Sequence, residues 1–160
     1  MTESGELIIA KREVVRNISE FSERVEFGLV FFAGQALKFP STGQPTNASP
    51  GMKQAAINFT NSIGSDHGSC VQKGMAAILQ MANQATSKRK IIVYVGDGGG
   101  TCGGGDEATY LRQTIALVSA LNYQRIQINA IGVLHQPPIN EAFLKQLASS
   151  NGGTFTRVTR

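Results

Sequence analysis

Residues 90–100 read KIIVYVGDGGG, an apolar run that ends in one carboxylate and continues into glycine. A run of Ile, Val and Tyr without polar alternation predicts a strand covered on both faces, as in a parallel sheet between helices. Ligands of such sheets bind beyond the carboxyl ends of the strands, where Asp97 falls. The glycines that follow let the backbone turn sharply and approach another group closely. The stretch therefore predicts a buried strand that delivers Asp97 to a site.

The rest of the chain alternates helical and extended patterns around this strand. Apolar residues at spacings of three and four predict helices, and short apolar or alternating runs predict strands. The helices are expected over 4–22, 52–61, 70–82, 106–121 and 140–149, and the strands over 24–33, 36–39, 126–133 and 154–158. This order predicts one domain over residues 1–160, with a doubly wound, mostly parallel sheet and helices on both faces. Residues 36–39, before Pro40, are expected as a short antiparallel edge strand.

Bulk composition excludes several function classes. The 160 residues are 41% hydrophobic and 16% charged, which is ordinary for a folded domain. The net charge is +4 and the compact basic run at 88–90 leads into a strand, so no nucleic-acid partner is expected. No apolar run approaches the roughly 20 residues of a membrane-spanning helix, so no membrane insertion is expected. The first residues do not resemble a secretion signal, so a cytoplasmic location is predicted by default.

Asp97 could serve as a metal ligand, a general base or a helix cap. Divalent cations such as magnesium need several oxygen ligands, and the polar loop before the third helix offers Ser65, Asp66 and Ser69. The alternative for Asp66 and Ser69 is capping of that helix. His67 and His135 lack a helix-spaced histidine partner, which argues against zinc.

The loop at 98–103 matches the G-x-G-x-x-G pattern that binds dinucleotides, and it follows a strand. However, that strand is not the first of its unit, and no Asp or Glu occurs between Leu111 and Gln136 to hold a ribose. A Rossmann-type nucleotide-binding enzyme that uses Gly98 to Gly103 is therefore the alternative function.

Several segments taken in order resemble the von Willebrand factor type A domain family over nearly the whole chain. They lie at 27–32, 68–70, 95–98, 128–133 and 147–155. The resemblance implies a doubly wound sheet and a non-enzymatic protein–protein interaction domain. It also implies a metal-ion-dependent adhesion site at the carboxyl edge of the sheet, where a protein partner's carboxylate completes the shell of a magnesium ion.

Three positions correspond to that metal site. Asp97 matches the family's aspartate, and Ser69-Cys70 stands where the family has a threonine turn. A thiol is a poor ligand for a hard cation, so Cys70 fits the site only if Ser69 substitutes for it. The family topology also places Cys70 and Cys102 on adjacent loops, which implies either a disulfide or a soft-metal site.

The family's first motif, Asp-x-Ser-x-Ser on a central first strand, is absent. Met1 stands about where the residue after that motif would be. The chain is therefore expected to lack the central first strand, either because the sequence is shortened or because this variant folds without it. The adhesion site would then be incomplete and bind magnesium weakly or not at all. Unpaired strand edges would invite self-association.

Overall fold

The computed structural model describes residues 5–66, 68–133 and 138–158 and shows a mixed α/β fold. Its helices are α1 (Glu6–Glu20), α2 (Pro50–Ser62), α3 (Val71–Gln84), α4 (Glu107–Leu121) and α5 (Pro138–Ser149). Its strands are β1 (Glu26–Phe27), β2 (Leu29–Phe32), β3 (Ala36–Phe39), β4 (Thr46–Asn47), β5 (Ile91–Gly96), β6 (Gln127–Val133) and β7 (Phe155–Val158). The predicted helices and the strands that became β5 and β6 are confirmed, with ends shifted by a few residues.

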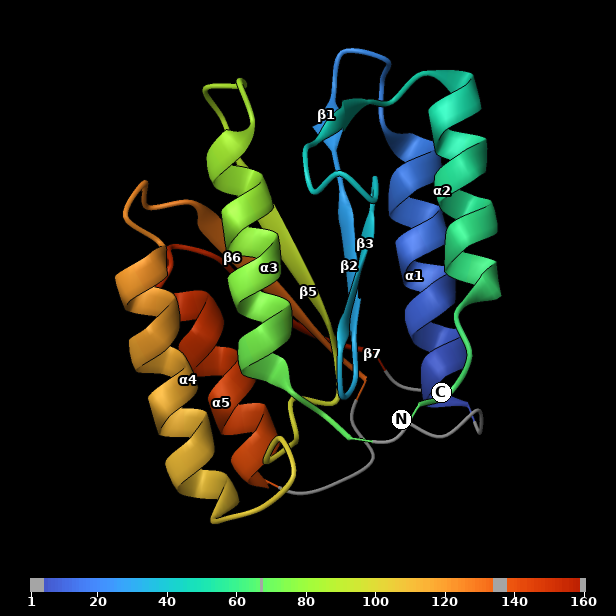
Figure 1. The fold of residues 1–160 in the computed structure, drawn as a ribbon. Coiled ribbons are helices and arrows are strands. Elements are labelled where there is room, and N and C mark those ends of the chain that lie inside the picture. Colours follow the sequence, from blue (N-terminus) through green and yellow to red (C-terminus); the bar gives the residue numbers. More distant parts are fainter. Residues whose placement is uncertain (1–4, 67, 134–137, 159–160) are drawn as a thin grey trace.

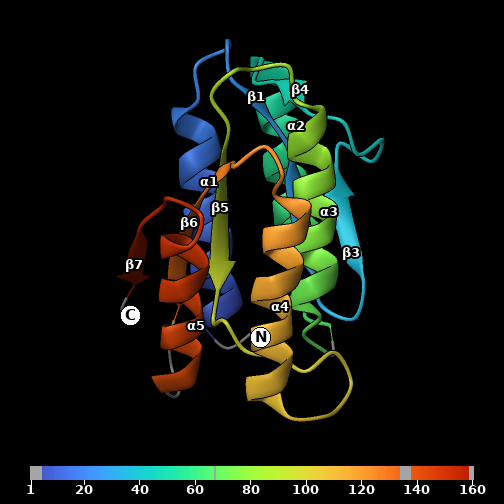
Figure 2. The same cartoon turned by 90° about the vertical axis from the view of Figure 1, so that its left-hand side faces the viewer.

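The strands form a central layer between two groups of helices. Figure 1 shows α1 and α2 on one side of the strands and α3, α4 and α5 on the other. In Figure 2, where the molecule is turned by 90°, α4 and α5 lie nearer the viewer than α1 and α2. Strands β5, β6 and β7 form a parallel sheet in that order, with Tyr94 beside Ala130 and Ala130 beside Phe155. Strands β2 and β3 form a separate antiparallel hairpin, which confirms the expected edge strand at 36–39.

The main core lies between the parallel sheet and helices α3, α4 and α5. Ile92 and Tyr94 of β5 are 4% exposed, and Ile128 of β6 is fully buried. They pack against apolar side chains of the three helices, Val71, Met75, Leu79, Leu111, Val118, Phe143, Leu144 and Leu147. A smaller core around Ile18 and Phe27 joins α1, α2 and the β1–β4 pair. The amphipathic stripes read from the sequence thus account for the packing of the helices.

The expectation that β5 is covered on both faces is wrong for one face. Ile91 and Val93 are 44% and 43% exposed, although their neighbours Ile92 and Tyr94 are buried. Because successive residues of a strand face opposite sides, Ile91 and Val93 lie on the face away from the core formed with α3 and α4. Figure 1 shows α1 on that side of the strands. Within the described residues β5 pairs only with β6, so nothing extends the sheet beyond its second edge.

Two local features depart from the sequence prediction. The strand expected at 24–33 is divided at Gly28, where the backbone lies against Met81 of α3 and a Cβ atom would collide with its sulfur. The polar loop at 41–50 contains β4, which pairs with β1. Helix α2 begins at Pro50, because Ser49 caps it by accepting from the Met52 N–H at 3.4 Å.

Over the described part of the chain, no helix has the length and apolar character needed to span a membrane.

Candidate functional site

Ser69 and Asp97, the two oxygen donors predicted for the site, meet at the backbone of Gly99. The Ser69 hydroxyl donates to the Gly99 carbonyl at 2.7 Å, and the Gly99 N–H donates to Asp97 Oδ1 at 3.1 Å. Both side chains are partly exposed. Burial, and after it the negative charge of Asp97, raises the pKa of the Tyr94 phenol below the loop well above its usual range. The structure therefore places Asp97 and Ser69 together at the carboxyl end of β5.

A disulfide joins Cys70 to Cys102 across a sequence separation of 32 residues. Of the two alternatives expected for these cysteines, the structure has the disulfide and not the soft-metal site. The Cys70 sulfur consequently has no thiolate to offer a cation. The Cys102 N–H also donates to the Ser69 carbonyl at 3.2 Å, so the glycine loop is fastened to the Ser69-Cys70 turn by a covalent bond and a hydrogen bond.

The same turn is fastened to the end of β2. The Cys70 N–H donates to the Ala33 carbonyl at 2.9 Å, and the Lys73 ammonium donates to the Gly34 carbonyl at 2.8 Å. The loops after β2, before α3 and after β5 therefore meet at one edge, as expected for carboxyl ends of parallel strands. His67 and His135 lie outside the described residues.

Glu107 and Asn140 also surround the glycine loop, and the sequence did not indicate them. Glu107 accepts from the Gly100 N–H at 2.9 Å. Asn140 is 7% exposed, and its Oδ1 has no hydrogen-bond partner within the described residues. A Cβ atom on Gly99 would lie 2.8 Å from Asn140 Nδ2 and 3.2 Å from Glu107 Oε1. The sequence suggested only that Glu107 begins a helix, where an acidic residue favours the dipole.

Ser69 is not a helix cap, contrary to the alternative weighed for it. The N-cap residue of α3 is Cys70, and no side chain of the cap accepts a hydrogen bond there. Instead the Gln72 N–H donates to the Tyr110 hydroxyl of α4 at 3.1 Å. The Ser69 hydroxyl is thus available to the site beside Asp97.

The side chains of Ser69 and Asp97 are suitable ligands for a hard cation, but they supply few of the ligands that such an ion needs. A serine hydroxyl and a carboxylate are oxygen donors of the kind that magnesium accepts, and magnesium commonly retains several waters beside one or two carboxylates. Within the described residues, no three His, Cys, Asp or Glu side chains gather into a metal-binding group. Ser69 and Asp97 would hold such an ion, and Asn140 Oδ1 is a buried oxygen nearby that has no hydrogen-bond partner in the described part of the chain.

The glycine loop is poorly suited to a phosphate. The amides of Gly99 and Gly100 already donate to the carboxylates of Asp97 and Glu107. A phosphate would have to displace these partners and approach two negative charges. Gly98 and Gly100 also lie against the protein itself, since a Cβ atom on Gly98 would be 2.8 Å from the Leu144 side chain.

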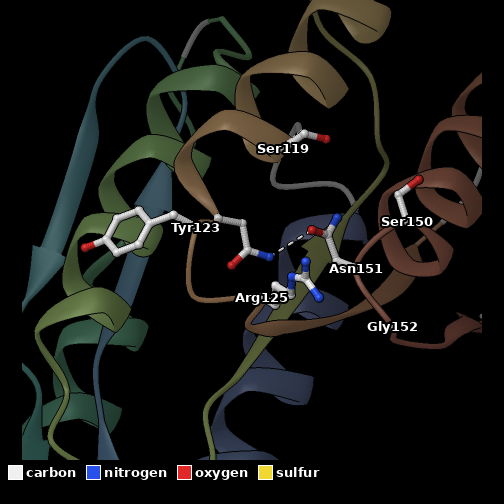
Figure 3. Close-up of a pocket in the computed structure, with 7 residues that line it drawn as sticks. Ser119, Tyr123, Arg125, Ser150, Asn151 and Gly152 are labelled. Carbon is white, nitrogen blue, oxygen red and sulfur yellow. Dashed lines mark hydrogen bonds between the residues drawn. The ribbon is translucent and has the colours of Figure 1, made fainter.

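A depression lies at the opposite, amino edge of the sheet, between the ends of α4 and α5 (Figure 3). The Asn122 side chain lines this depression and is engaged in hydrogen bonds within the fold. Its amide donates to the Ile126 carbonyl and to Asn151 Oδ1, both at 2.8 Å. Arg125 and Tyr123 line its rim. Parallel sheets bind ligands at the other edge, so the Asp97 edge is the better candidate.

The sequence matches no protein-family model and no curated protein. The fold, however, is that of von Willebrand factor type A domains. It superposes on a von Willebrand factor type A protein from Catenulispora acidiphila with a TM-score of 0.79, at 17% identity, over 96% of this chain and 34% of that one. It superposes on the pilus adhesin SpaC from Lactobacillus rhamnosus GG in its open conformation with a TM-score of 0.75, at 14% identity, over 99% of this chain and 27% of the adhesin. Another form of this adhesin gives a TM-score of 0.72 at 12% identity, over 98% of this chain and 26% of the adhesin. The chain thus spans between about a quarter and a third of these proteins.

Proposed function

We propose that this domain, which has the von Willebrand factor type A fold, is a non-enzymatic protein-interaction module that contacts its partner at the Asp97 edge. The observation that carries the proposal is the convergence of Ser69 and Asp97 on Gly99, at the edge where three loops are fastened together. An edge that is fastened by a disulfide and presents the partly exposed carboxylate of Asp97 suits recognition of a partner better than it suits turnover. One of the proteins that share the fold is an adhesin, which supports the same class of function.

The metal-ion-dependent adhesion site is proposed to be degenerate. Ser69 and Asp97 supply two oxygens, and Cys70, at the position where the family has a threonine turn, is consumed in the disulfide. Water or a carboxylate of the protein partner would have to complete the shell of a magnesium ion. Magnesium binding is therefore proposed to be weak or absent without the partner.

The sheet is proposed to lack its central first strand. In support, β2 and β5 belong to separate sheets, and the β5 side chains Ile91 and Val93 are partly exposed. Such open strand edges predispose a domain to pair with another chain, self-association included.

The disulfide between Cys70 and Cys102 favours an oxidising compartment over the cytoplasmic location expected from the sequence. Disulfides persist outside the reducing cytosol, where thiol systems keep cysteines reduced. We therefore propose that the domain works where this bond is maintained.

Amide spectra of the isotope-labelled protein test the role of the edge. Magnesium chloride is added first alone and then with the peptide Gly-Asp-Gly as a carboxylate probe. We expect shifts confined to Ser69 and Gly98 to Gly100, with a magnesium dissociation constant weaker than micromolar. Asp97→Asn should weaken the response at least about tenfold, because the variant removes the only full charge among the proposed ligands.

The matched control is Asp106→Asn, which removes an exposed carboxylate from the same loop and keeps a residue able to cap α4. It should leave the titration unchanged. Micromolar magnesium affinity that Asp97→Ala abolishes would contradict the degenerate site, and shifts that survive Asp97→Asn would contradict the edge as the contact surface. Binding of a nicotinamide cofactor, measured by fluorescence, would favour the Rossmann-type alternative at Gly98 to Gly103.

A further inference from the structure

The depression at the amino edge of the sheet has the size of a ligand pocket. Its volume is about 530 Å³, and pockets for small molecules commonly measure roughly 300–1,000 Å³. It lies where α4 ends before β6 and where α5 ends before β7. The lining residues are Ser119, Asn122, Tyr123, Arg125, Ser150, Asn151 and Gly152. We call this depression the amino-edge pocket.

Hydrogen bonds between two asparagines hold the turns of the amino-edge pocket in place. Asn122 is 7% exposed, and its amide donates to the Ile126 carbonyl and to Asn151 Oδ1, both at 2.8 Å. The Asn122 Oδ1 atom accepts from the Ile126 N–H, also at 2.8 Å. The Asn151 amide in turn donates to the Leu147 carbonyl of α5 at 2.8 Å. The shape of the pocket is therefore fixed before a ligand arrives, which lowers the entropic cost of binding.

Arg125 supplies the only charged side chain of the lining. None of the ion pairs in the described part of the chain involves it, and its guanidinium forms no hydrogen bond with another described residue. Figure 3 shows the Arg125 side chain beside that of Asn151 at the pocket. A guanidinium presents a planar fork of N–H groups that matches the two oxygens of a carboxylate. Arg125 is therefore an available anion-binding group in a preformed pocket.

The charges around the amino-edge pocket favour a ligand with a single negative charge. Residues 108–140 and 142–160, which include both turns, contain no Asp or Glu. Glu141 lies in the first turn of α5, at the other end of that helix, and forms ion pairs with two basic side chains there. Lys90 is outside the lining, and its ammonium donates to Gln124 Oε1 at 2.7 Å. The single guanidinium thus balances one carboxylate, whereas a phosphate dianion would bring a second charge that has no partner in the lining.

The carboxyl ends of α4 and α5 offer little opposition to such a ligand. Free carbonyls at a helix end would repel an anion. Most of these carbonyls already accept hydrogen bonds within the protein. They are the carbonyls of Val118 and Leu121 in α4 and of Gln146, Leu147, Ala148 and Ser149 in α5. The full charge of the guanidinium therefore determines which ions the pocket attracts.

The neutral part of the lining is suited to hydroxyl groups. Ser119 and Ser150 are exposed, and neither hydroxyl forms a hydrogen bond with another described residue. The Tyr123 ring points away from the other labelled side chains, so no aromatic surface faces the pocket (Figure 3). A lining of hydroxyls, amides and one guanidinium is complementary to a hydrophilic ligand and not to an apolar one.

We propose that the amino-edge pocket binds a sugar acid, a polyhydroxylated ring that carries one carboxylate. The carboxylate pairs with the Arg125 guanidinium, and ring hydroxyls exchange hydrogen bonds with the hydroxyls of Ser119 and Ser150. This site goes beyond the protein-interaction function proposed above. It lies at the opposite edge of the sheet and does not depend on Asp97.

Amide spectra of the intact, oxidised 160-residue chain test the proposal at constant ionic strength. The protein is titrated separately with sodium glucuronate, glucose, sodium acetate and inorganic phosphate. Glucuronate should shift the amides of residues 119–126 and 150–153 and should bind at least about tenfold more tightly than either glucose or acetate. Glucose lacks the charge-assisted hydrogen bonds, and acetate lacks the hydroxyls.

Three variants assign the two halves of the ligand. Arg125→Asn should reduce the affinity for glucuronate to that for glucose. Asparagine suits this variant because the φ angle of Arg125 is 54°, a left-handed conformation that asparagine adopts more readily than most residues. The double variant Ser119→Ala with Ser150→Ala should weaken glucuronate binding and leave acetate binding unchanged. The control Arg112→Gln removes the same charge from an exposed position near the start of α4 and should change nothing.

Several outcomes would overturn the proposal. Glucuronate shifts that are absent from residues 119–126 and 150–153, or that persist in Arg125→Asn, would show that Arg125 does not form this site. Acetate binding as tight as glucuronate binding would mean a counterion site without sugar recognition. Tighter binding of phosphate than of glucuronate would contradict the preference for one charge. None of these outcomes affects the magnesium titration with Asp97→Asn, so the two proposals fail independently.

Discussion

At the residue scale, the Glu26 carboxylate connects segments that are 60 residues apart. Its hydrogen bonds with the hydroxyl and N–H of Thr86, the hydroxyl first, lower the pKa of Glu26 below its usual range. Because the folded-state pKa is the lower one, the stabilisation is present above the unfolded-state pKa and is lost as the pH falls through the folded-state pKa. A carbon-detected NMR titration should find this low pKa. Thr86→Val should raise the pKa of Glu26 towards the ordinary value of a glutamate and Ser87→Ala should raise it less, whereas an unchanged pKa in Thr86→Val would show that the hydrogen bonds between Glu26 and Thr86 do not form.

Single residues also show what the sequence could predict about the site. Asp97 and Ser69 were predicted because each lies at the end of a recognisable element, and the topology of a parallel sheet brings such ends together. Glu107 and Asn140 could not be predicted, because their contacts with Gly99 and Gly100 depend on how α4 and α5 pack on the sheet. Amphipathic periodicity gives the buried face of a helix but not its position along a strand.

At the element scale, two helical glycines make a matched pair. Gly74 of α3 lies against the Phe32 ring of β2, where an added Cβ atom would overlap it, whereas a Cβ atom on Gly51 of α2 would meet nothing within 4 Å. Gly74→Ala should lower the free energy of unfolding by about 1–3 kcal/mol through overpacking. Gly51→Ala should raise it by up to about 1 kcal/mol through helix propensity. Urea denaturation measures both, and a stabilising Gly74→Ala would mean that α3 and β2 are not in contact as described.

Helices and strands could be predicted where the sequence has a clear hydrophobic pattern. They could not be predicted where the formation of a strand depends on pairing with another strand. Strand β4 has two polar residues, Thr46 and Asn47, and exists because β1 offers it a ladder. The apolar run of β5 indicated two buried faces, yet Ile91 and Val93 are partly exposed. The residue types of a strand indicate which of its faces can be buried. They do not indicate whether another helix or strand is present to cover that face.

At the scale of the whole molecule, the disulfide fastens the glycine loop of the parallel sheet to the turn that holds the β2–β3 hairpin. It closes a loop with a sequence separation of 32 residues, so the loss of chain entropy in the unfolded state corresponds to about 3–4 kcal/mol of stabilisation. Reduction should lower the free energy of unfolding by about this amount. It should also broaden the amide signals of Ser69 and Gly98 to Gly100, because the same bond fixes the Asp97 edge. The bond therefore links the stability of the domain to the geometry of its proposed contact surface.

A double variant, Cys70→Ala with Cys102→Ala, separates loss of the bond from other effects of the reductant. It should match the reduced protein in its urea midpoint and should not respond to reductant, while Asp106→Asn in the same loop should keep the full response. If the double variant is as stable as the oxidised protein, two backbone hydrogen bonds suffice to hold the edge. They join the N–H of position 70 to the Ala33 carbonyl and the N–H of position 102 to the Ser69 carbonyl. In that case the two halves of the fold are joined by packing on α3 and not by the disulfide, and the predicted broadening should be absent as well.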